Sequence, residues 1–295
     1  MRIAVTGASG LIGSALAPRL REKGHEVVRL VRRQARAPDE VQWDPDGGTL
    51  DDAALGSVDA IVHLAGETIG RRWSTERRRR IRESRLRGTR LVAEAVAARD
   101  PRPVLLCASA VGYYGQRGDE RLTEASPAGD GFLAEVVAAW ESAADPAREA
   151  GARVVHLRQA PVLARQGGML EPMLLPFKLG LGGRVGRGDQ WWSWVTLDDV
   201  VAAYLFALER PLAGAFNLVA PGVVRNREFV DTLGEVLHRP TVFPLPGTAV
   251  KLVWGEMGAE MLLGGQRAVP ERLLGEGFTF AYPELRPALE HVLRG

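Results

Sequence analysis

Three glycines near the N-terminus form a G-x-x-G-x-x-G pattern, one residue wider than the standard glycine fingerprint of a turn that binds a dinucleotide phosphate. Gly7, Gly10 and Gly13 directly follow an apolar run at 3–5. Glycines in such a turn let a pyrophosphate approach the backbone, and the free amides and dipole of the following helix favour its negative charge. This pattern predicts dinucleotide binding; the alternative is an ordinary strand-to-helix turn.

The elements expected around the glycines are those that a dinucleotide site requires. The run at 3–5 is expected to be a buried strand, 14–23 a helix with Leu16 and Leu20 on one face, and 27–31 a second strand. Strand, turn, helix and strand form half of a dinucleotide-binding unit. The turn residues expected to contact the cofactor are Gly7, Ser9, Gly10, Leu11, Ile12 and Gly13.

Two arginines at the end of the second strand bear on the choice of cofactor. A site for NAD usually has an acidic residue there, which holds the ribose 2′-hydroxyl. This chain instead has Arg32 and Arg33, and a guanidinium suits a 2′-phosphate. We therefore predict NADP(H) as the cofactor; the alternative is that one or both arginines are solvated surface charges.

A third apolar segment, at 58–66, is expected to be a strand that ends in a turn. In an open parallel sheet the ligand lies at the carboxyl ends of the strands. His63, Leu64, Ala65 and Glu67 are therefore expected near the cofactor. For His63 the alternative is a packed histidine without a ligand.

Hydroxyl groups follow the next buried strand, at 104–109. Ser109, Tyr113 and Tyr114 are expected at the same ligand edge, where one of them could exchange a proton with a substrate. A tyrosine with its ordinary pKa near ~10 would need a cation nearby, and Arg85 is the candidate. For the two tyrosines the alternative is aromatic packing.

Strands alternate with helices along most of the chain, which predicts an α/β fold with a doubly wound parallel Rossmann sheet. Residues 34–57 are polar and rich in turn residues, and little regular structure is expected there. Residues 71–99 are expected to be helical, with a break near Gly88. The arginine run at 77–80 is expected to be a solvated helix face, with phosphate binding as the alternative.

The C-terminal third departs from this rhythm and is expected to form a smaller α/β lobe over the substrate. We expect an NADP-binding domain at 1–165, completed by about 195–219, and a substrate lobe from 166–194 and 220–295. Helices are expected in the lobe at 226–237, 247–262 and 284–294. Arg184 and Arg187, next to a strand expected at 191–195 that holds three tryptophans, are candidates to contact substrate; the alternative is a glycine-rich loop between the lobes with the tryptophans in the core.

Composition limits the classes of partner. The chain has 295 residues and a formal net charge of +2, so charge gives no reason to expect nucleic acid. One cysteine, Cys107, excludes an internal disulfide, and no apolar run has the length of a membrane span. We expect a cytoplasmic protein with a small-molecule substrate and no membrane, nucleic-acid or metal partner; the sequence leaves its oligomeric state open.

Several motifs together resemble the extended short-chain dehydrogenase/reductases, in the superfamily of NAD-dependent epimerases and dehydratases. They also resemble, more narrowly, its atypical group of sugar-nucleotide epimerases. The motifs are the glycine turn, Leu64–Glu67, Ser84-Arg85, Tyr113–Gly115, Leu174–Phe177, Gly180–Gly183, Trp194–Asp199 and Gly264–Arg267. The resemblance implies a Rossmann domain with a C-terminal substrate lobe. It also implies that Arg85 and the segment near Val162 contact the cofactor.

One departure from this family affects the expected chemistry. Extended members carry Tyr-x-x-x-Lys on the helix after the fifth strand, where the lysine lowers the pKa of the proton-donating tyrosine. Here that helix, at 132–141, has neither residue. We expect either an NADP(H)-dependent oxidoreductase or epimerase with another proton donor, or a non-catalytic NADP(H)-binding redox sensor or scaffold. Nucleic-acid binding through 77–80 is a weaker third hypothesis.

Overall fold

A computed structural model describes residues 1–294 and contains one large sheet of eight strands. Its strand order is β12-β8-β6-β5-β1-β2-β3-β4, and all neighbours are parallel except β3 and β4. The predicted doubly wound parallel sheet is confirmed. The strands are β1 (Arg2–Thr6), β2 (Glu26–Val31), β3 (Glu40–Asp44), β4 (Thr49–Leu50), β5 (Ala60–His63), β6 (Val104–Ala110), β8 (Val154–Gln159) and β12 (Gly214–Leu218).

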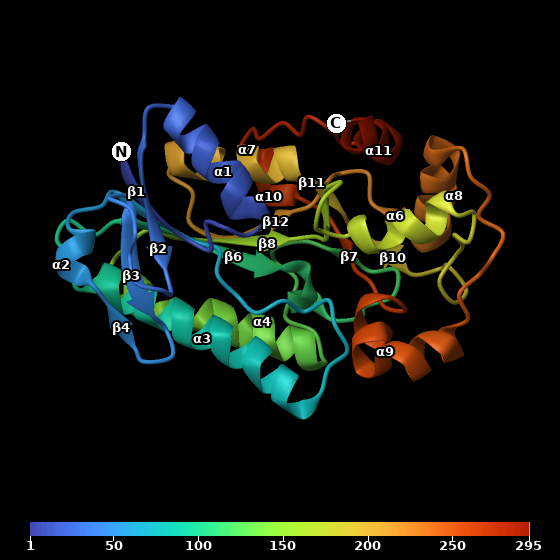
Figure 1. Ribbon diagram of the computed structural model, residues 1–295, viewed down its shortest axis with the longest axis horizontal. Coiled ribbons are helices and arrows are strands. Elements are labelled where there is room, and N and C mark those ends of the chain that lie inside the picture. The colour runs from blue at the N-terminus through green and yellow to red at the C-terminus, as the bar shows by residue number, and fades with distance from the viewer. Residues whose placement is uncertain (295) are drawn as a thin grey trace.

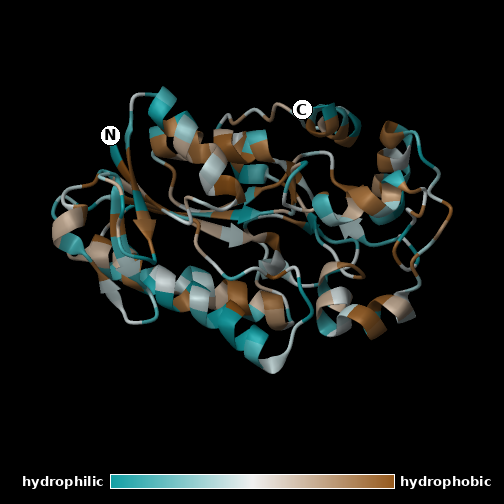
Figure 2. Cartoon of the chain, in the orientation of Figure 1, coloured by the Kyte–Doolittle hydropathy of each residue, from teal (hydrophilic) through white to brown (hydrophobic). Residues whose placement is uncertain are grey.

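Helices cover both faces of this sheet (Figure 1). On one face lie α1 (Leu11–Glu22) and α7 (Leu197–Glu209), and on the other α3 (Thr75–Ala97), α4 (Phe132–Ser142) and α5 (Asp145–Glu149). Apolar side chains of the strands pack against each layer, so two separate cores form. Figure 2 shows brown and teal residues alternating along the helices, as burial of one helix face requires.

The expectation of little regular structure at 34–57 is wrong. This segment contains β3, β4 and the short helix α2 (Asp52–Leu55). Trp43 of β3 is buried, with its ring edge-on to His63 at 5.9 Å. The expected break in α3 is also absent, and Gly88 lies inside a continuous helix. A Cβ at Gly88 would lie 3.4 Å from the rings of both Trp43 and His63.

The C-terminal part forms a third core beside the end of the sheet. The three helices expected there are confirmed as α8 (Asn226–Leu237), α9 (Gly247–Met261) and α11 (Leu285–Arg294), and α9 is kinked at Gly255. The single strand expected at 191–195 is wrong: two short strands in different small sheets replace it. The other elements are η1 (Val111–Tyr114), β7 (Arg121–Leu122), β9 (Val162–Leu163), α6 (Glu171–Lys178), β10 (Trp191–Trp192), β11 (Val195–Thr196), β13 (Val224–Arg225), β14 (Arg267–Ala268) and α10 (Glu271–Gly275).

Candidate functional site

The glycine turn between β1 and α1 is shaped for a diphosphate. Gly7 has a φ of +65°, and a Cβ on Gly13 would lie 2.3 Å from the carbonyl oxygen of Gly7, so both positions require glycine. Gly10 caps α1 without a side-chain hydrogen bond, and the first turn holds no acidic residue. The Gly10 amide donates to the Gly7 carbonyl at 2.9 Å and the first intrahelical bond is donated by the Ser14 amide, so the amides of residues 11–13 are left for an anion. The turn therefore fits the pyrophosphate of a dinucleotide.

A buried hydrogen-bond cluster holds the neighbouring turn after β5. The Thr6 hydroxyl oxygen accepts from the Leu64 amide at 3.0 Å and the Ala65 amide at 3.2 Å, and lies 2.9 Å from Nδ1 of His63. Since this oxygen already accepts twice, its proton goes to Nδ1. Burial lowers the pKa of His63 to about 4, so the ring is neutral. His63 is fully buried, and its ring contacts the Thr6 hydroxyl that holds the 64–65 backbone. This arrangement matches the alternative of a packed histidine without a ligand.

Helix α3 fixes the rest of this turn through the adjacent Ser84 and Arg85. The Glu67 amide donates to the Ser84 hydroxyl at 3.1 Å, and Arg85 donates to the Glu67 carbonyl at 3.0 Å. The Arg85 guanidinium lies 5.0 Å from the ring centroid of Trp140, and burial lowers the pKa of Arg85 to about 10. It therefore stays charged at neutral pH beside the sheet edge, while Arg77 pairs with the Glu67 carboxylate at 3.1 Å.

The two arginines after β2 are not equivalent. Arg33 donates two hydrogen bonds, of 2.8 and 2.6 Å, to the buried Glu40 carboxylate, which also accepts from the Arg36 amide. These bonds hold the pKa of Glu40 at about 2. Arg32 is exposed, and no ion pair engages it within residues 1–294. Arg33 thus orders the loop, and Arg32 is the guanidinium left for a ligand.

Two of the three proposed proton donors belong to a buried network. The Ser109 hydroxyl donates to Glu141 at 2.6 Å, and the Tyr114 hydroxyl donates to Asn217 at 2.7 Å while accepting from Arg158 at 3.0 Å. Burial raises the pKa of Tyr114. Both residues are buried within this network, so Tyr113 is the most accessible of the three candidates, and a proton-transfer role for Ser109 or Tyr114 stays a prediction. Sequence spacing could place them at the edge but not show which way they point.

Arg158 and Glu141 form the centre of this network. Their side chains are 5% and 13% exposed, and two hydrogen bonds of 2.8 Å join them. Burial alone would raise the pKa of Glu141, but the Arg158 guanidinium holds it below its ordinary value. The same guanidinium lies 3.5 Å from the ring centroid of Tyr113, which is half-buried. Tyr113 is the third candidate donor, and its cation is Arg158 rather than Arg85.

The helix that carries Tyr-x-x-x-Lys in extended members offers apolar side chains here. A Cβ on Gly112 of η1 would lie 3.5 Å from the Leu133 side chain and 3.9 Å from that of Val137, both on α4. Glu260 of α9 accepts hydrogen bonds of 3.1 Å from the Phe132 and Leu133 amides at the start of α4. The C-terminal part of the chain therefore contacts the helix that borders the site.

The remaining sequence candidates are Val162 and the arginine run. Val162 is half-buried on β9, and its carbonyl accepts from the Met169 amide at 2.8 Å. In the arginine run, Arg77, Arg78 and Arg79 each form an ion pair with a glutamate. Few of these guanidinium groups are therefore left to bind nucleic-acid phosphates. This agrees with the interpretation of the run as a solvated helix face.

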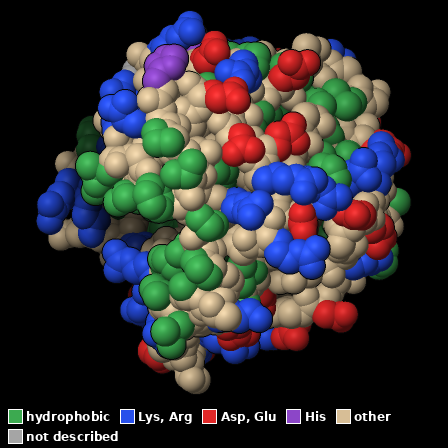
Figure 3. Space-filling view, turned by 90° about the vertical axis from the view of Figure 1, so that its right-hand side faces the viewer, with side chains coloured by type: hydrophobic (Ala, Val, Ile, Leu, Met, Phe, Trp, Pro, Cys, Tyr) green, Lys and Arg blue, Asp and Glu red, His purple; other side chains and the backbone are tan. Residues whose placement is uncertain are grey.

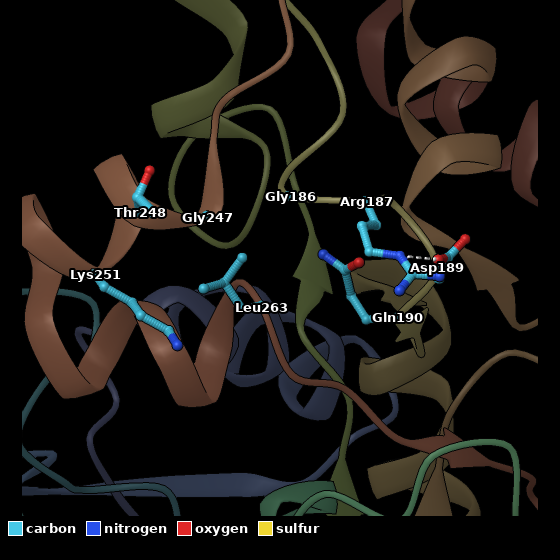
Figure 4. Close-up of a pocket in the computed structure, with 8 residues that line it drawn as sticks. All are labelled: Gly186, Arg187, Asp189, Gln190, Gly247, Thr248, Lys251 and Leu263. Carbon is cyan, nitrogen blue, oxygen red and sulfur yellow. Dashed lines mark hydrogen bonds and ion pairs between the residues drawn. The ribbon is translucent and has the colours of Figure 1, made fainter.

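A hollow of about 740 Å³ lies between the loop 186–190 and α9. Figure 4 shows Lys251 of α9 on one side of it and Arg187 and Gln190 on the other, with Arg187 joined to Asp189. Of the arginines singled out from the sequence, only Arg187 lines it. Lys251 and Gln190 were missed, because their distance along the chain gives no signal that they meet.

Two kinds of site are absent from residues 1–294. No group of three or more His, Cys, Asp or Glu side chains is placed to hold a metal ion. No helix in this range has the length and apolar character needed to cross a membrane.

Comparisons with known proteins agree with this geometry. Residues 3–218 match the NAD dependent epimerase/dehydratase family, and 245–292 match a domain of unknown function, DUF1731. An epimerase family protein of Mycobacterium bovis is 44% identical over 98% of this chain and 97% of its own length. The crystal structure of human epimerase family protein SDR39U1 with NADPH has a TM-score of 0.90 and 37% identity and covers 100% of both chains. A nucleoside-diphosphate sugar epimerase from Corynebacterium glutamicum has a TM-score of 0.83 and 36% identity, over 99% of this chain and 58% of that one.

Proposed function

The chain belongs to the NAD dependent epimerase/dehydratase family, and on that basis we propose that it binds NADP(H) and serves hydride exchange with a small hydroxyl or carbonyl compound. One observation carries the cofactor choice: Arg32 is free at the end of β2, where NAD sites have an acid. The solved human relative, crystallised with NADPH, supports the same choice. Nucleotide-linked sugars are among the substrates to test.

The groups that would hold the cofactor lie along one edge of the sheet. The amides of the glycine turn would bind the pyrophosphate, and Arg32 the 2′-phosphate. The backbone at Leu64 and Ala65, fixed by Thr6, would border the dinucleotide, together with Glu67 and Val162. When bound, the nicotinamide supplies the hydride, and the protein's task is to orient it and to move a proton.

Tyr113 is the group we propose for the proton. Its ring lies 3.5 Å from the Arg158 guanidinium, and Tyr113 is the least buried of the three hydroxyl-bearing candidates. The test is turnover of NADPH with aldehydes, ketones and nucleotide sugars by the wild type and by Tyr113→Phe. Loss of a general acid is expected to lower kcat by at least about 100-fold without changing NADPH affinity. Tyr114→Phe is the matched control, and an unchanged kcat in Tyr113→Phe would contradict the role.

A second candidate function is NADP(H)-dependent binding without turnover. It is favoured by the burial of the Ser109 and Tyr114 hydroxyls and by the apolar Leu133 and Val137 beside η1. Its signature is tight NADPH binding, no turnover with the whole substrate panel, and partner binding that differs between NADP⁺ and NADPH. Equal partner binding in both redox states would contradict a sensing role. We also propose a cytoplasmic location, which suits the single buried thiol of Cys107.

A further inference from the structure

Exposed apolar side chains are concentrated in three short parts of the chain, at 175–181, 242–243 and 252–253. Of nine exposed large apolar residues within 1–294, seven lie between 175 and 253. We call these seven the apolar face: Leu175, Leu179, Leu181, Val242, Phe243, Leu252 and Val253. Figure 3 looks onto the side that carries α6, α8 and α9, and shows hydrophobic side chains gathered over one half of it, with Lys and Arg next to them. Such clustering marks an interaction surface rather than scattered exposure.

Backbone bonds join the first two parts of the apolar face. Gly183 pairs antiparallel with Val242, and the Phe243 amide donates to the Gly182 carbonyl at 3.3 Å. Leu179 and Leu181 therefore lie beside Val242 and Phe243. These side chains are 56–68% exposed and belong to turns and a short ladder, so they project from the surface.

The third part of the apolar face is the first half of α9. Leu252 and Val253 are 78% and 51% exposed and precede the kink at Gly255, whose φ is +59°. Beyond the kink, Glu256 pairs with Arg78 at 2.7 Å, and Glu260 holds the start of α4. The second half of α9 thus packs on the α3–α4 layer, and the first half is left outside it.

Cations surround the apolar face. Residues 165–190 and 238–255 contain six Lys or Arg and two Asp or Glu. Lys178, Arg184, Arg239 and Lys251 are exposed, and no carboxylate within residues 1–294 pairs with them. Asp189 is already held by Arg187 and Arg227.

The nearest acidic groups of the adjacent α8 are also occupied. Glu235 pairs with Arg286, and Asp231 accepts from the Thr241 hydroxyl. Two copies of the chain meeting at this face would bring together more cations than the carboxylates there, chiefly Glu171 and Asp231, can offset. The charge therefore favours an anionic occupant over a second copy.

We propose that the apolar face docks on the surface of an anionic lipid bilayer. Its Leu, Val and Phe side chains enter the headgroup boundary, and the surrounding cations stay at the phosphate level. Attraction to anionic headgroups adds to the burial of apolar area. The proposed contact is peripheral and differs from the expectation of no membrane partner, which stays untested.

The test is sedimentation of the full chain with phosphatidylcholine vesicles, with and without phosphatidylglycerol. The wild type is expected to bind the anionic vesicles, and more weakly at high salt. Lys178→Gln and Arg239→Gln are each expected to weaken binding about fivefold. Leu181→Ser combined with Phe243→Ser is expected to abolish it. Leu274→Ser is the matched control, because Leu274 is 47% exposed on α10, outside the apolar face.

Four results would overturn the proposal. The first is no binding of the wild type to anionic vesicles. The second is equal binding to neutral and anionic vesicles. The third is an equal loss of binding in the Leu274→Ser control. The fourth is a stable dimer in light scattering that the Leu181 and Phe243 serine variants dissociate, since a second copy would then cover the face. NADPH affinity and circular dichroism of each variant show that the fold is intact.

Discussion

Two stretches of the carboxyl edge of this parallel sheet, which we call the first edge and the second edge, differ in how their polar groups are used. At the edge formed by the β1–α1 turn and the end of β2, amides of α1 and the Arg32 guanidinium are left without protein partners within residues 1–294. At the edge formed by β6, η1 and α4, the hydroxyls of Ser109 and Tyr114 are consumed by a buried network. The first edge therefore offers unpaired groups to a ligand, whereas the polar groups of the second edge stabilise the fold.

This difference teaches that cofactor binding and acid–base chemistry are separable in this fold. The cofactor side depends on backbone geometry that a few glycines enforce. The chemistry of the other side depends on single side chains, which can be replaced without loss of the fold. Binding and turnover must therefore be measured separately, and the following predictions treat the two edges as independent.

The largest expected effect is at the buried ion pair of the second edge. Arg158→Met leaves the Glu141 carboxylate buried without its partner and is expected to lower the free energy of unfolding by about 3–5 kcal/mol. Chemical denaturation measures the loss. NADPH affinity is expected to stay unchanged, and a parallel loss of affinity would show that the two edges are coupled.

The next effect is at the glycine turn. Gly13→Ala places a methyl group where the Gly7 carbonyl already lies, and NADPH affinity is expected to fall at least about 100-fold, or ~2.7 kcal/mol. Calorimetric titration measures it. Gly275→Ala is the control, because no atom lies within 4 Å of its Cβ position. Retained affinity in Gly13→Ala would remove the turn from the binding site.

A smaller effect is the pH dependence that His63 gives to the first edge. Its pKa of about 4 in the folded chain lies below the ordinary 6.5, so the unfolded chain takes up a proton that the folded chain does not. Stability from this group is complete above pH 6.5 and falls as the pH decreases toward 4, by about 2 kcal/mol between pH 7 and 5.

His63→Asn keeps an acceptor for the Thr6 hydroxyl and is expected to reduce this pH-dependent loss by the same amount. Denaturant unfolding at pH 7 and pH 5 measures the difference between the two proteins. An identical pH slope in wild type and variant would contradict the neutral, buried state of the ring.

The smallest effect separates the two arginines after β2. Arg32→Ala is expected to weaken NADPH binding about tenfold, or ~1.4 kcal/mol, and to leave NADH binding unchanged. Arg33→Ala acts only through the loop that Glu40 orders, so its effect on affinity is expected to be smaller. A larger loss in Arg33→Ala than in Arg32→Ala would reverse the assignment.

The sequence was sufficient wherever a local pattern determines the structure. The glycine turn, the apolar strands at the sheet centre and the helices of the C-terminal part are encoded within about twenty residues each. Strand β3 was not predictable in this way. Its Glu40 is buried because Arg33 pairs with it, and the flanking prolines and glycines are typical of loops.

Side-chain direction was the other limit. Spacing put Ser109, Tyr113 and Tyr114 at one edge, but partners from β8, β12 and α4 decide that two of them are buried. Gly88 likewise suggested a break, although it lies inside a continuous helix and packs closely against the rings of Trp43 and His63. These contacts join distant segments, so no local pattern reports them.

The central claim is that the first edge binds NADP(H) through the glycine turn and Arg32. Calorimetric titration of the wild-type chain with NADPH and, separately, with NADH tests it most directly. The account predicts that both bind at this edge and that NADPH binds at least about tenfold more tightly, since only NADPH has a phosphate for Arg32. Binding of neither coenzyme, or tighter binding of NADH, would contradict it.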